Sequence, residues 1–257
     1  MNVLGIETSC DDTAAAVIKD GRIIKSNVVA SQSDMHKKYG GIIPEIASRE
    51  HFTALIPVVN EALEQASLTY KNIDAIAVTN GPGLAGSLLI GVNSAKGLAM
   101  SWDKPLIGIN HLEGHIYSAW LEDLEPDQNA GFPIVCLIAS GGHTDLILMK
   151  NHLEYQLVGK TRDDAAGEAF DKAARVLGLG FPGGPEIQKM SEAAKDELDP
   201  LPRPEIKASL DFSFSGLKTA LVRRAESEGF YPMTDSNGPS HYQTTEYSFA
   251  FQEAIVD

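Results

Sequence analysis

The sequence is short of cysteine, and it lacks any apolar run long enough to cross a bilayer. Only Cys10 and Cys136 occur among 257 residues, and both lie in or beside apolar, strand-like segments. Two thiols without a cysteine framework indicate a reducing compartment, so we expect a cytoplasmic protein. Strand-like residues begin at Val3, where a signal peptide would show charged and apolar regions. We therefore expect no membrane association.

Positive charge is also scarce. Lysine and arginine number 21 against 35 aspartate and glutamate residues, which gives a formal net charge of −14. This balance excludes a protein that coats nucleic acid by itself, because binding to phosphates requires a surplus of cations. Any contact with RNA would need a local basic patch or a partner. At 43% hydrophobic and 22% charged residues, the composition is that of a globular chain with one large or two small domains.

Two histidines with helical spacing follow an apolar run. Pro105–Ile109 predicts a short buried strand, and Asn110 is a favourable N-cap, so we expect a helix to begin there. His111 and His115 are four residues apart, which places them on one face of that helix. They form half of a metal site, although one capping and one packed histidine is an equally good interpretation. Leu112 stands where a zincin motif needs glutamate, and a third ligand must come from elsewhere.

The two halves of the chain show the same order of elements. A strand, a small polar turn, a strand, a hairpin turn and a third strand occur over residues 3–30 and again over 133–159. A helix is predicted after each triplet, from about Glu45 to Ala66 and from Asp163 to Leu177. The repeat therefore indicates an α/β fold with two topologically similar subdomains that offer their turns to a shared cleft.

We place the boundary between these subdomains at residues 1–130 and 131–257. The first subdomain contains the histidine helix and closes with a strand, a glycine-rich loop and a helix over residues 73–100. The second has no counterpart of this ending, and its last amphipathic stretch, 247–257, resembles the middle of a helix. We therefore expect an incomplete second subdomain, because the chain is a fragment or because this subdomain is unusually short.

The first predicted helix has an apolar face. Its members recur at helical spacing and are Phe52, Leu55, Ile56, Val59 and Leu63. The next helix, after Gly86, is rich in glycine, alanine and serine, as close helix packing requires. We interpret it as a docking surface for a homologous partner, with Gly91 as a position at which a bulky residue would block docking.

Each half also contains a turn suited to an anion. Ser140–Thr144 joins two predicted strands, and its consecutive glycines allow backbone N–H groups to point at a ligand. Thr8–Thr13 occupies the equivalent place in the first half. A plain hairpin turn is the alternative interpretation. Together the two turns are expected to clamp the phosphate of a nucleotide.

Acidic residues line one side of the helix predicted from Asp163. Asp164, Glu168, Asp171 and Lys172 recur there at helical spacing. A solvated acidic face is the interpretation that spacing alone favours. The many small residues between them are the counter-argument, because they let a ligand approach the helix closely.

Two later segments combine a turn with possible ligand contacts. Phe181–Pro185 is predicted to be a rigid turn that brings backbone close to a flat ligand, with a simple loop as the alternative. Phe212–Thr219 supplies a hydroxyl N-cap for a helix with Lys218, Arg223 and Arg224. This basic helix face would meet a phosphate or remain solvated.

Taken together, these segments resemble the tRNA N6-adenosine threonylcarbamoyltransferase family, formerly known as O-sialoglycoprotein endopeptidases. The resemblance implies an actin-, Hsp70- and hexokinase-like (ASKHA) two-lobed fold with duplicated subdomains. The matching segments follow in order along essentially the whole chain: Gly5–Asp11, Gly40–Glu45, Gly81–Leu84, His111–His115, Ser140–Thr144, Asp163–Lys172, Gly183–Pro185 and Phe212–Thr219.

The resemblance also implies an acyltransferase that acts on tRNA. Such an enzyme moves the threonylcarbamoyl group from L-threonylcarbamoyladenylate to N6 of the adenosine beside the anticodon, position 37, in ANN-decoding tRNAs, and releases AMP. The implied partners are tRNA and, in a bacterial set, a homologous non-catalytic subunit and a P-loop ATPase. ATP or ADP is a further candidate ligand. No partner is a membrane.

The resemblance assigns residues to this chemistry one by one. His111 and His115 would bind one iron or zinc ion, and the third protein ligand would lie in a segment beyond Asp257. No residue is assigned as a covalent catalyst. The residues that would contact the adenylate substrate are Ile138, Ala139, Ser140, Gly141, Gly142, Asp171 and Gly184. Candidate accessory nucleotide contacts are Ser9, Asp11 and Glu168.

The chain departs from the family pattern at two positions. Asp12 stands where the family usually has glutamate, and Gln188 stands where some members have aspartate. A glycine- and asparagine-bearing substrate loop of the family would also lie beyond the last residue.

Three other functions are compatible with the same pattern. A kinase-like or ATPase enzyme of this superfold would need an acidic base but not the histidine pair. A non-catalytic scaffold would need neither, so His111 and His115 are evidence against it. A metallopeptidase would need a glutamate beside His111, which the sequence lacks.

Overall fold

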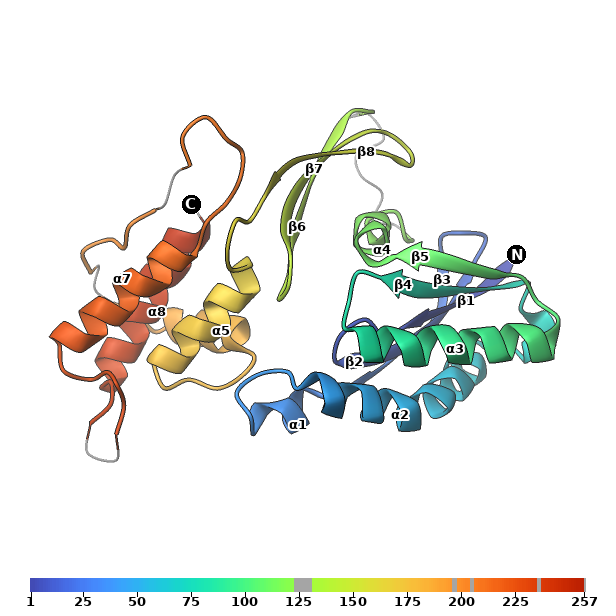
Figure 1. Cartoon of the computed structure of the whole chain (residues 1–257), viewed down its shortest axis with the longest axis horizontal. Coiled ribbons are helices and arrows are strands. Elements are labelled where there is room, and N and C mark those ends of the chain that lie inside the picture. The colour runs from blue at the N-terminus through green and yellow to red at the C-terminus, as the bar shows by residue number, and fades with distance from the viewer. Residues whose placement is uncertain (123–130, 196–197, 204–205, 235–236, 257) are drawn as a thin grey trace. The chain divides into compact units, whose positions relative to one another are not determined.

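The fold is that of a computed structural model, and it consists of two compact units, Met1–Ala130 and Gly131–Asp257, each of which is considered by itself (Figure 1). The residues that the structure describes are 1–122, 131–195, 198–203, 206–234 and 237–256. Among these residues, no helix combines the length and the apolar character needed to cross a bilayer.

The first unit is built on a mixed β-sheet. β1 pairs antiparallel with β2 and parallel with β4, while β2 also pairs with β3 and β4 with β5. Ile6 lies opposite Ala15 on one side and Val78 on the other, so these buried side chains form a row across the sheet. Within residues 1–122 the strands, in the order β3-β2-β1-β4-β5, are β1 (Asn2–Glu7), β2 (Asp12–Lys19), β3 (Ile23–Ser31), β4 (Ala75–Gly81) and β5 (Leu106–Asn110).

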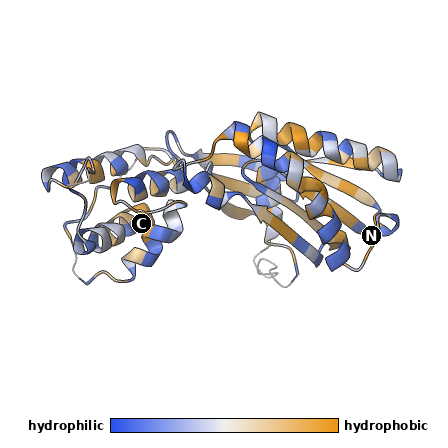
Figure 2. Cartoon of the chain, turned by 90° about the horizontal axis from the view of Figure 1, so that it is seen from below, coloured by the Kyte–Doolittle hydropathy of each residue, from blue (hydrophilic) through white to orange (hydrophobic). Residues whose placement is uncertain are grey.

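Two long helices cover one face of this sheet, and a short one lies on the other face (Figure 1). Leu55 of the first long helix packs with Leu4 and Ile76 of the sheet in one buried cluster, and each such side chain contributes roughly 1.5–3 kcal/mol through burial. The strands of this unit are largely apolar along their length (Figure 2). Its helical elements are α1 (Ser33–Lys37), α2 (Pro44–Gln65), the 3-10 turn η1 (Tyr70–Asn72), α3 (Ala85–Trp102) and α4 (His111–Ser118).

The apolar face predicted for α2 is only partly correct. Leu55, Val59 and Leu63 are buried as expected, but Phe52 is 73% exposed and Ile56 is 46% exposed. The helix instead buries small or polar side chains on its sheet-facing side, among them Ala47, His51 and Ala62. The apolar stripe is therefore wider than the sheet can cover, and part of it faces outward.

The second unit combines a small antiparallel sheet with a group of helices. β7 pairs with β6 and with β8, as the predicted repeat of strand, turn, strand, hairpin and strand requires. Leu217, Leu221 and Phe251 are buried in the helical core. The elements in the described part of residues 131–256 are β6 (Ile134–Ala139), β7 (Thr144–Asn151), β8 (Glu154–Lys160), α5 (Ala166–Val176), α6 (Gly183–Ser191), α7 (Ser215–Ser227) and α8 (His241–Val256).

This topology confirms the expected α/β class and the repeat of three antiparallel strands within it. Among its described residues, the second unit has no counterpart of the parallel strands β4 and β5. Two boundaries were predicted wrongly. α5 begins at Ala166 rather than Asp163, and the segment predicted as a rigid turn, Phe181–Pro185, contains the first residues of α6.

Candidate functional site

The candidate metal centre begins at the junction of β5 and α4, as the sequence predicts. The side-chain oxygen of Asn110 accepts hydrogen bonds from the backbone N–H groups of Leu112 at 2.9 Å and Glu113 at 3.4 Å. It thereby satisfies two of the donors that a helix N-terminus leaves unpaired. Asn110 fixes where α4 starts and therefore where its first residue, His111, projects.

The two imidazoles of α4 converge on one point. The ring centroids of His111 and His115 are 4.5 Å apart at an interplanar angle of 80°, and their Nε2 atoms are 3.1 Å apart. Two nitrogen ligands of a tetrahedral zinc ion lie about 3.3 Å apart, given bonds of about 2.0–2.1 Å. The pair therefore fits one ion. Among the described residues, no group of three or more histidine, cysteine, aspartate or glutamate side chains could hold a metal, so a third ligand is not found there.

A carboxylate at the end of β1 contacts the other nitrogen of His111. Glu7 Oε2 lies 3.2 Å from His111 Nδ1 and accepts a hydrogen bond from the Thr79 hydroxyl at 2.5 Å. The backbone N–H of Ser9 donates to the second carboxylate oxygen. Burial raises the pKa of Glu7, but the hydrogen bonds from His111, Ser9 and Thr79 outweigh burial and lower the pKa to about 2. Glu7 is therefore ionised at neutral pH and can only accept.

The turn that follows β1 is held by the two long helices. The carbonyl oxygen of Cys10 accepts from His51 Nε2 of α2 at 3.0 Å and from the Ser87 hydroxyl of α3 at 3.2 Å. The Thr8 hydroxyl donates to the Ser87 carbonyl at 2.9 Å. His51 Nδ1 also lies 2.8 Å from the Thr13 hydroxyl. The turn between β1 and β2 is thus fixed from both helices.

The structure places two predicted accessory contacts in this turn. Ser9 is buried, and its hydroxyl oxygen lies 3.2 Å from His111 Nδ1, so it stands beside the histidine pair. Asp11 is half-buried at the tip of the turn. The Cys10 thiol between them is not a candidate nucleophile at neutral pH, because burial and the neighbouring Asp11 raise its pKa to about 12.

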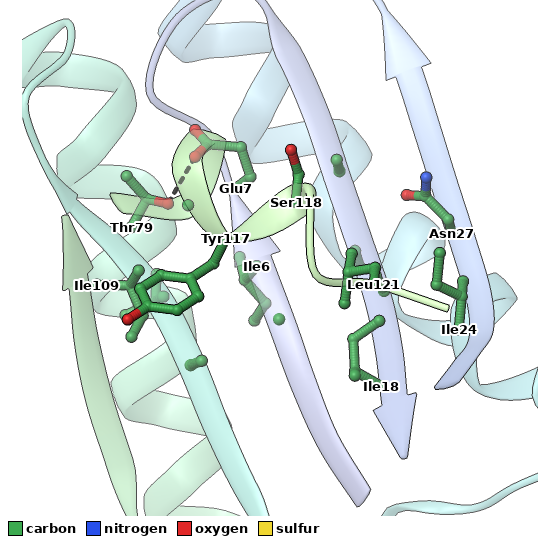
Figure 3. Close-up of a pocket in the computed structure, with 17 residues that line it drawn as sticks. Ile6, Glu7, Ile18, Ile24, Asn27, Thr79, Ile109, Tyr117, Ser118 and Leu121 are labelled. Carbon is green, nitrogen blue, oxygen red and sulfur yellow. Dashed lines mark hydrogen bonds between the residues drawn. The ribbon is translucent and has the colours of Figure 1, made fainter. Parts of the chain in front are cut away.

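An apolar cavity lies beside Glu7, and sequence reasoning missed it. It has a volume of about 410 Å³ and lies between the sheet and the end of α4, where Tyr117 and Leu121 form one wall (Figure 3). On the sheet side the cavity is lined by Gly5, which has no side chain, and by the methyl groups of Ala14 and Ala16. The feature of the sequence that could have indicated this cavity is the run of small residues on neighbouring strands, because they leave space that larger side chains would fill.

In the second unit, the Ser140–Thr144 turn packs on the start of α5. The Gly167 N–H donates to the Ser140 carbonyl at 3.1 Å, and the Ala166 N–H donates to the Thr144 hydroxyl at 2.8 Å. Gly141 and Gly142 are exposed, and no atom would lie within 4 Å of a Cβ added at either. The turn therefore has a fixed base and an open tip. Of the predicted substrate contacts before it, Ile138 is buried and Ala139 is exposed at the end of β6.

Asp171 and Gly184 meet at the start of α6. Asp171 Oδ1 accepts from the Gly183 N–H at 2.7 Å, which caps this helix from the neighbouring α5. A Cβ added at Gly184 would meet no atom within 4 Å, so a ligand could approach the backbone there. The structure therefore groups the predicted substrate residues of this unit around α5, with the turn at its N-terminal end and α6 further along.

The predicted acidic face of α5 is partly neutralised by its own lysine. Lys172 Nζ lies 2.6 Å from Asp164 and 2.8 Å from Glu168. Asp163 stands outside the helix and accepts from Phe214 N, Ser213 Oγ and Ser215 Oγ at the start of α7. Spacing alone favoured a solvated acidic face, but these carboxylates make specific contacts with Lys172 and with the start of α7.

Comparison with known proteins gives a consistent assignment. The sequence profile described as TsaD, tRNA N6-adenosine threonylcarbamoyltransferase, matches residues 23–257. A protein of that name from Thermomicrobium roseum is 61% identical over 230 residues, which cover 88% of this chain and 62% of that protein. Another from Symbiobacterium thermophilum is 52% identical over 254 residues, with 99% of this chain and 71% of that protein covered. The chain thus spans about two thirds of the length of these relatives.

A solved structure adds a remote likeness. YeaZ from Pseudomonas aeruginosa superposes with a TM-score of 0.40 and 15% identity, over 95% of this chain and 97% of that one. A score this low carries no conclusion. The family assignment comes from the sequence matches, because the profile extends over residues 23–257 and the Symbiobacterium protein matches 99% of the chain. The chain belongs to the tRNA N6-adenosine threonylcarbamoyltransferase family.

Proposed function

We propose that this chain takes part in the transfer of a threonylcarbamoyl group from L-threonylcarbamoyladenylate to N6 of adenosine 37 in ANN-decoding tRNAs. Family membership supports the reaction class. The observation that carries the proposal is the 3.1 Å separation of the His111 and His115 Nε2 atoms, because it fits one metal ion at the start of a helix.

The reaction needs positioning more than it needs a nucleophilic side chain. The N6 amine attacks the carbamoyl carbon, the bond from that carbon to the adenylate oxygen breaks, and AMP leaves with the electron pair while N6 loses a proton. The adenylate is already activated, so holding the amine near the carbon can supply several kcal/mol. Cys10 and Cys136 have raised thiol pKa values, which agrees with a reaction that uses no thiolate.

His111 and His115 would hold an iron or zinc ion through their Nε2 atoms. When bound, such an ion supplies Lewis-acid stabilisation of negative charge that develops on the carbamoyl oxygen. Two residues of the chain position the histidines: Asn110 sets the start of α4, and Glu7 contacts Nδ1 of His111.

The adenylate would be held by the second unit. The open Gly141 and Gly142 backbone of the turn suits a phosphate, since consecutive N–H groups attract an anion. Ile138, Ala139 and Ser140 would flank it. Asp171 and the open Gly184 backbone at the start of α6 would contact the remainder of the nucleotide. Ser9, Asp11 and Glu168 are the candidate accessory contacts for a nucleotide.

We also propose that the exposed side of α2 and α3 binds a homologous, non-catalytic chain. Phe52 and Ile56 of α2 and Leu89 of α3 are 73%, 46% and 61% exposed. Gly86 brings the two helices together, since a Cβ added there would lie 3.2 Å from Ser48 Cβ. Gly91 was a wrong choice for testing this surface. A Cβ there would meet the Thr8 hydroxyl at 2.2 Å, so Gly91 faces the sheet.

The acidic composition supports help from partners in binding tRNA. With a formal net charge of −14, the chain as a whole lacks the surplus of cations that binding a polyanion requires. A partner set with a P-loop ATPase would suit a bacterial protein, and ATP or ADP would then be a ligand of the assembly.

The proposal is tested by mass spectrometry of tRNA nucleosides from cells depleted of this protein. Depletion should remove threonylcarbamoyladenosine, and the natural gene should restore it. A His111→Ala/His115→Ala gene should restore less than a tenth of the modified nucleoside. His152→Ala, a histidine of the β7–β8 hairpin, is the matched control and should restore it fully.

Unchanged modification on depletion, in a cell with no second copy, would overturn the reaction. It would favour a nucleotide-dependent ATPase or kinase-like enzyme of the same fold. Full rescue by the double variant would overturn the role of the histidine pair.

A further inference from the structure

We propose that Glu7 is a positioning residue of the metal centre, which holds His111 with its proton on Nδ1 and so presents the Nε2 lone pair to the ion. This inference rests on the proposed metal role of His111 and His115. It concerns a residue that contacts neither the ion nor the substrate and acts through His111.

The proton assignment follows from the partners of the His111 ring. Two oxygens, Glu7 Oε2 and the Ser9 hydroxyl, lie 3.2 Å from Nδ1. The Glu7 carboxylate already accepts from the Thr79 hydroxyl and the Ser9 N–H, so it is placed as an acceptor for the Nδ1 proton as well, and the Ser9 hydroxyl oxygen can share that proton. A proton on Nδ1 leaves Nε2 of the neutral ring as an acceptor. His115 Nε2 then donates to His111 Nε2 across their 3.1 Å contact when no ion is bound. The ring is thus in the tautomer that a metal bound at Nε2 needs.

Glu7 is itself held in place from two directions. It is the last residue of β1, and the Thr79 hydroxyl of the adjacent strand β4 donates to its Oε2 at 2.5 Å. The backbone N–H of Ser9 donates to its Oε1. These bonds come from a sheet and a tight turn, so the carboxylate has little freedom to rotate away from the imidazole. A carboxylate that is fixed in this way also fixes the ring plane of His111.

Glu7 does not fit as the third ligand of the ion. Its contact is with Nδ1, while the ion would bind at Nε2 on the far side of the ring. In agreement, Glu7 does not form a three-residue metal group with the histidine pair among the described residues. A carboxylate that hydrogen-bonds the second nitrogen of a ligating imidazole is a common arrangement, and its loss typically weakens metal binding 10- to 100-fold.

The test compares Zn²⁺ binding by the whole chain and by Glu7→Gln, which keeps the shape of the side chain but removes its charge. Zn²⁺ affinity is measured by calorimetry, and the His111 nitrogens are observed by ¹⁵N NMR in the metal-free protein. We expect Glu7→Gln to bind Zn²⁺ about 10- to 100-fold more weakly. The His111 signals should shift from a Nδ1–H pattern to a mixture of tautomers.

Glu113→Gln is the matched control, because Glu113 lies on α4 near the histidines and loses the same charge. It should leave the affinity within about twofold of wild type. Thr79→Val removes the hydroxyl that holds Glu7 and should weaken binding in the same direction but less than Glu7→Gln does. If Glu7→Gln does not fold, Thr79→Val decides the question by the same two measurements.

Unchanged Zn²⁺ affinity and an unchanged His111 pattern in Glu7→Gln would overturn the inference. If His111→Ala binds Zn²⁺ as well as wild type does, the proposed metal site itself is wrong. The two failures are therefore distinguishable.

Discussion

Gly167 sets the distance between α5 and the Ser140–Thr144 turn. A Cβ added at Gly167 would lie 2.7 Å from both the Gly141 Cα and the Ser140 carbonyl oxygen. Both are backbone atoms, so neither can rotate out of the way. Even a methyl group there would displace the turn from the helix.

We therefore expect Gly167→Ala to lower the free energy of unfolding by about 1–3 kcal/mol, as overpacking does. Urea denaturation followed by circular dichroism at 222 nm measures this free energy. Tryptophan fluorescence would not report on the second unit, because Trp102 and Trp120 both lie in the first. Gly184→Ala is the control, because its Cβ meets no atom within 4 Å, and it should change stability by less than about 1 kcal/mol. Equal stabilities of the two variants would contradict this account.

Local spacing made some of these residues predictable. The Asn110 cap and the shared face of His111 and His115 follow from positions within one turn of helix. The contact of Glu7 with His111 joins residues 104 positions apart, and only the pairing of β1 with β4 and of β4 with β5 brings them together. The sequence reveals the two imidazoles but not the carboxylate behind them.

At the scale of elements, Asp163 links the loop before α5 to the start of α7. Its carboxylate accepts from Phe214 N at 2.8 Å and from the Ser213 and Ser215 hydroxyls at 2.6 and 2.7 Å. Burial raises its pKa, but these hydrogen bonds outweigh burial and lower the pKa to about 2. The ionised form is therefore the one that stabilises the folded chain.

Asp163→Asn should reduce the free energy of unfolding at pH 7 by about 1 kcal/mol, the usual size of a helix cap. Because the folded pKa lies below the unfolded value of 3.8, the contribution is fully present above about pH 4 and disappears as the pH falls through 2. In thermal melts, the difference in melting temperature between the variant and wild type should be smaller at pH 2.5 than at pH 7. Asp103→Asn, at the C-cap of α3, is the control and should show no such narrowing.

The helix starts were predicted wrongly because side chains distant in the sequence determine them. Asp163 was expected to begin α5, but its carboxylate is engaged by a segment some fifty residues later in the chain. The glycines before Pro185 were expected to form a turn, yet Asp171 of α5 caps them into a helix. Helix starts that depend on a distant side chain cannot be read from neighbouring residues.

At the scale of the whole molecule, the exposed apolar side of α2 and α3 should govern assembly. Leu89→Glu should weaken binding of a homologous partner at least tenfold, because it places a charge in a desolvated contact. Calorimetric titration with the homologous subunit of the same organism measures this. Leu153→Glu, at a side chain 71% exposed in the β7–β8 hairpin, should bind as wild type does. Equal loss in both variants would argue against a specific surface.

The repeat was the strongest whole-molecule signal in the sequence. Two triplets of strands with polar turns predicted the antiparallel strands that both sheets share. The cavity beside Glu7 was not predictable, since it depends on how α4 lies over small residues of separate strands.

The carbonyl of Cys10 links the β1–β2 turn to two helices. It accepts hydrogen bonds from His51 of α2 and Ser87 of α3, so a sliding or rotation of these helices against each other would break a hydrogen bond or move the turn. The next residue back along the chain, Ser9, reaches the imidazole of His111. One short turn therefore contacts both α2 and α3 through Cys10 and the histidine pair of α4 through Ser9.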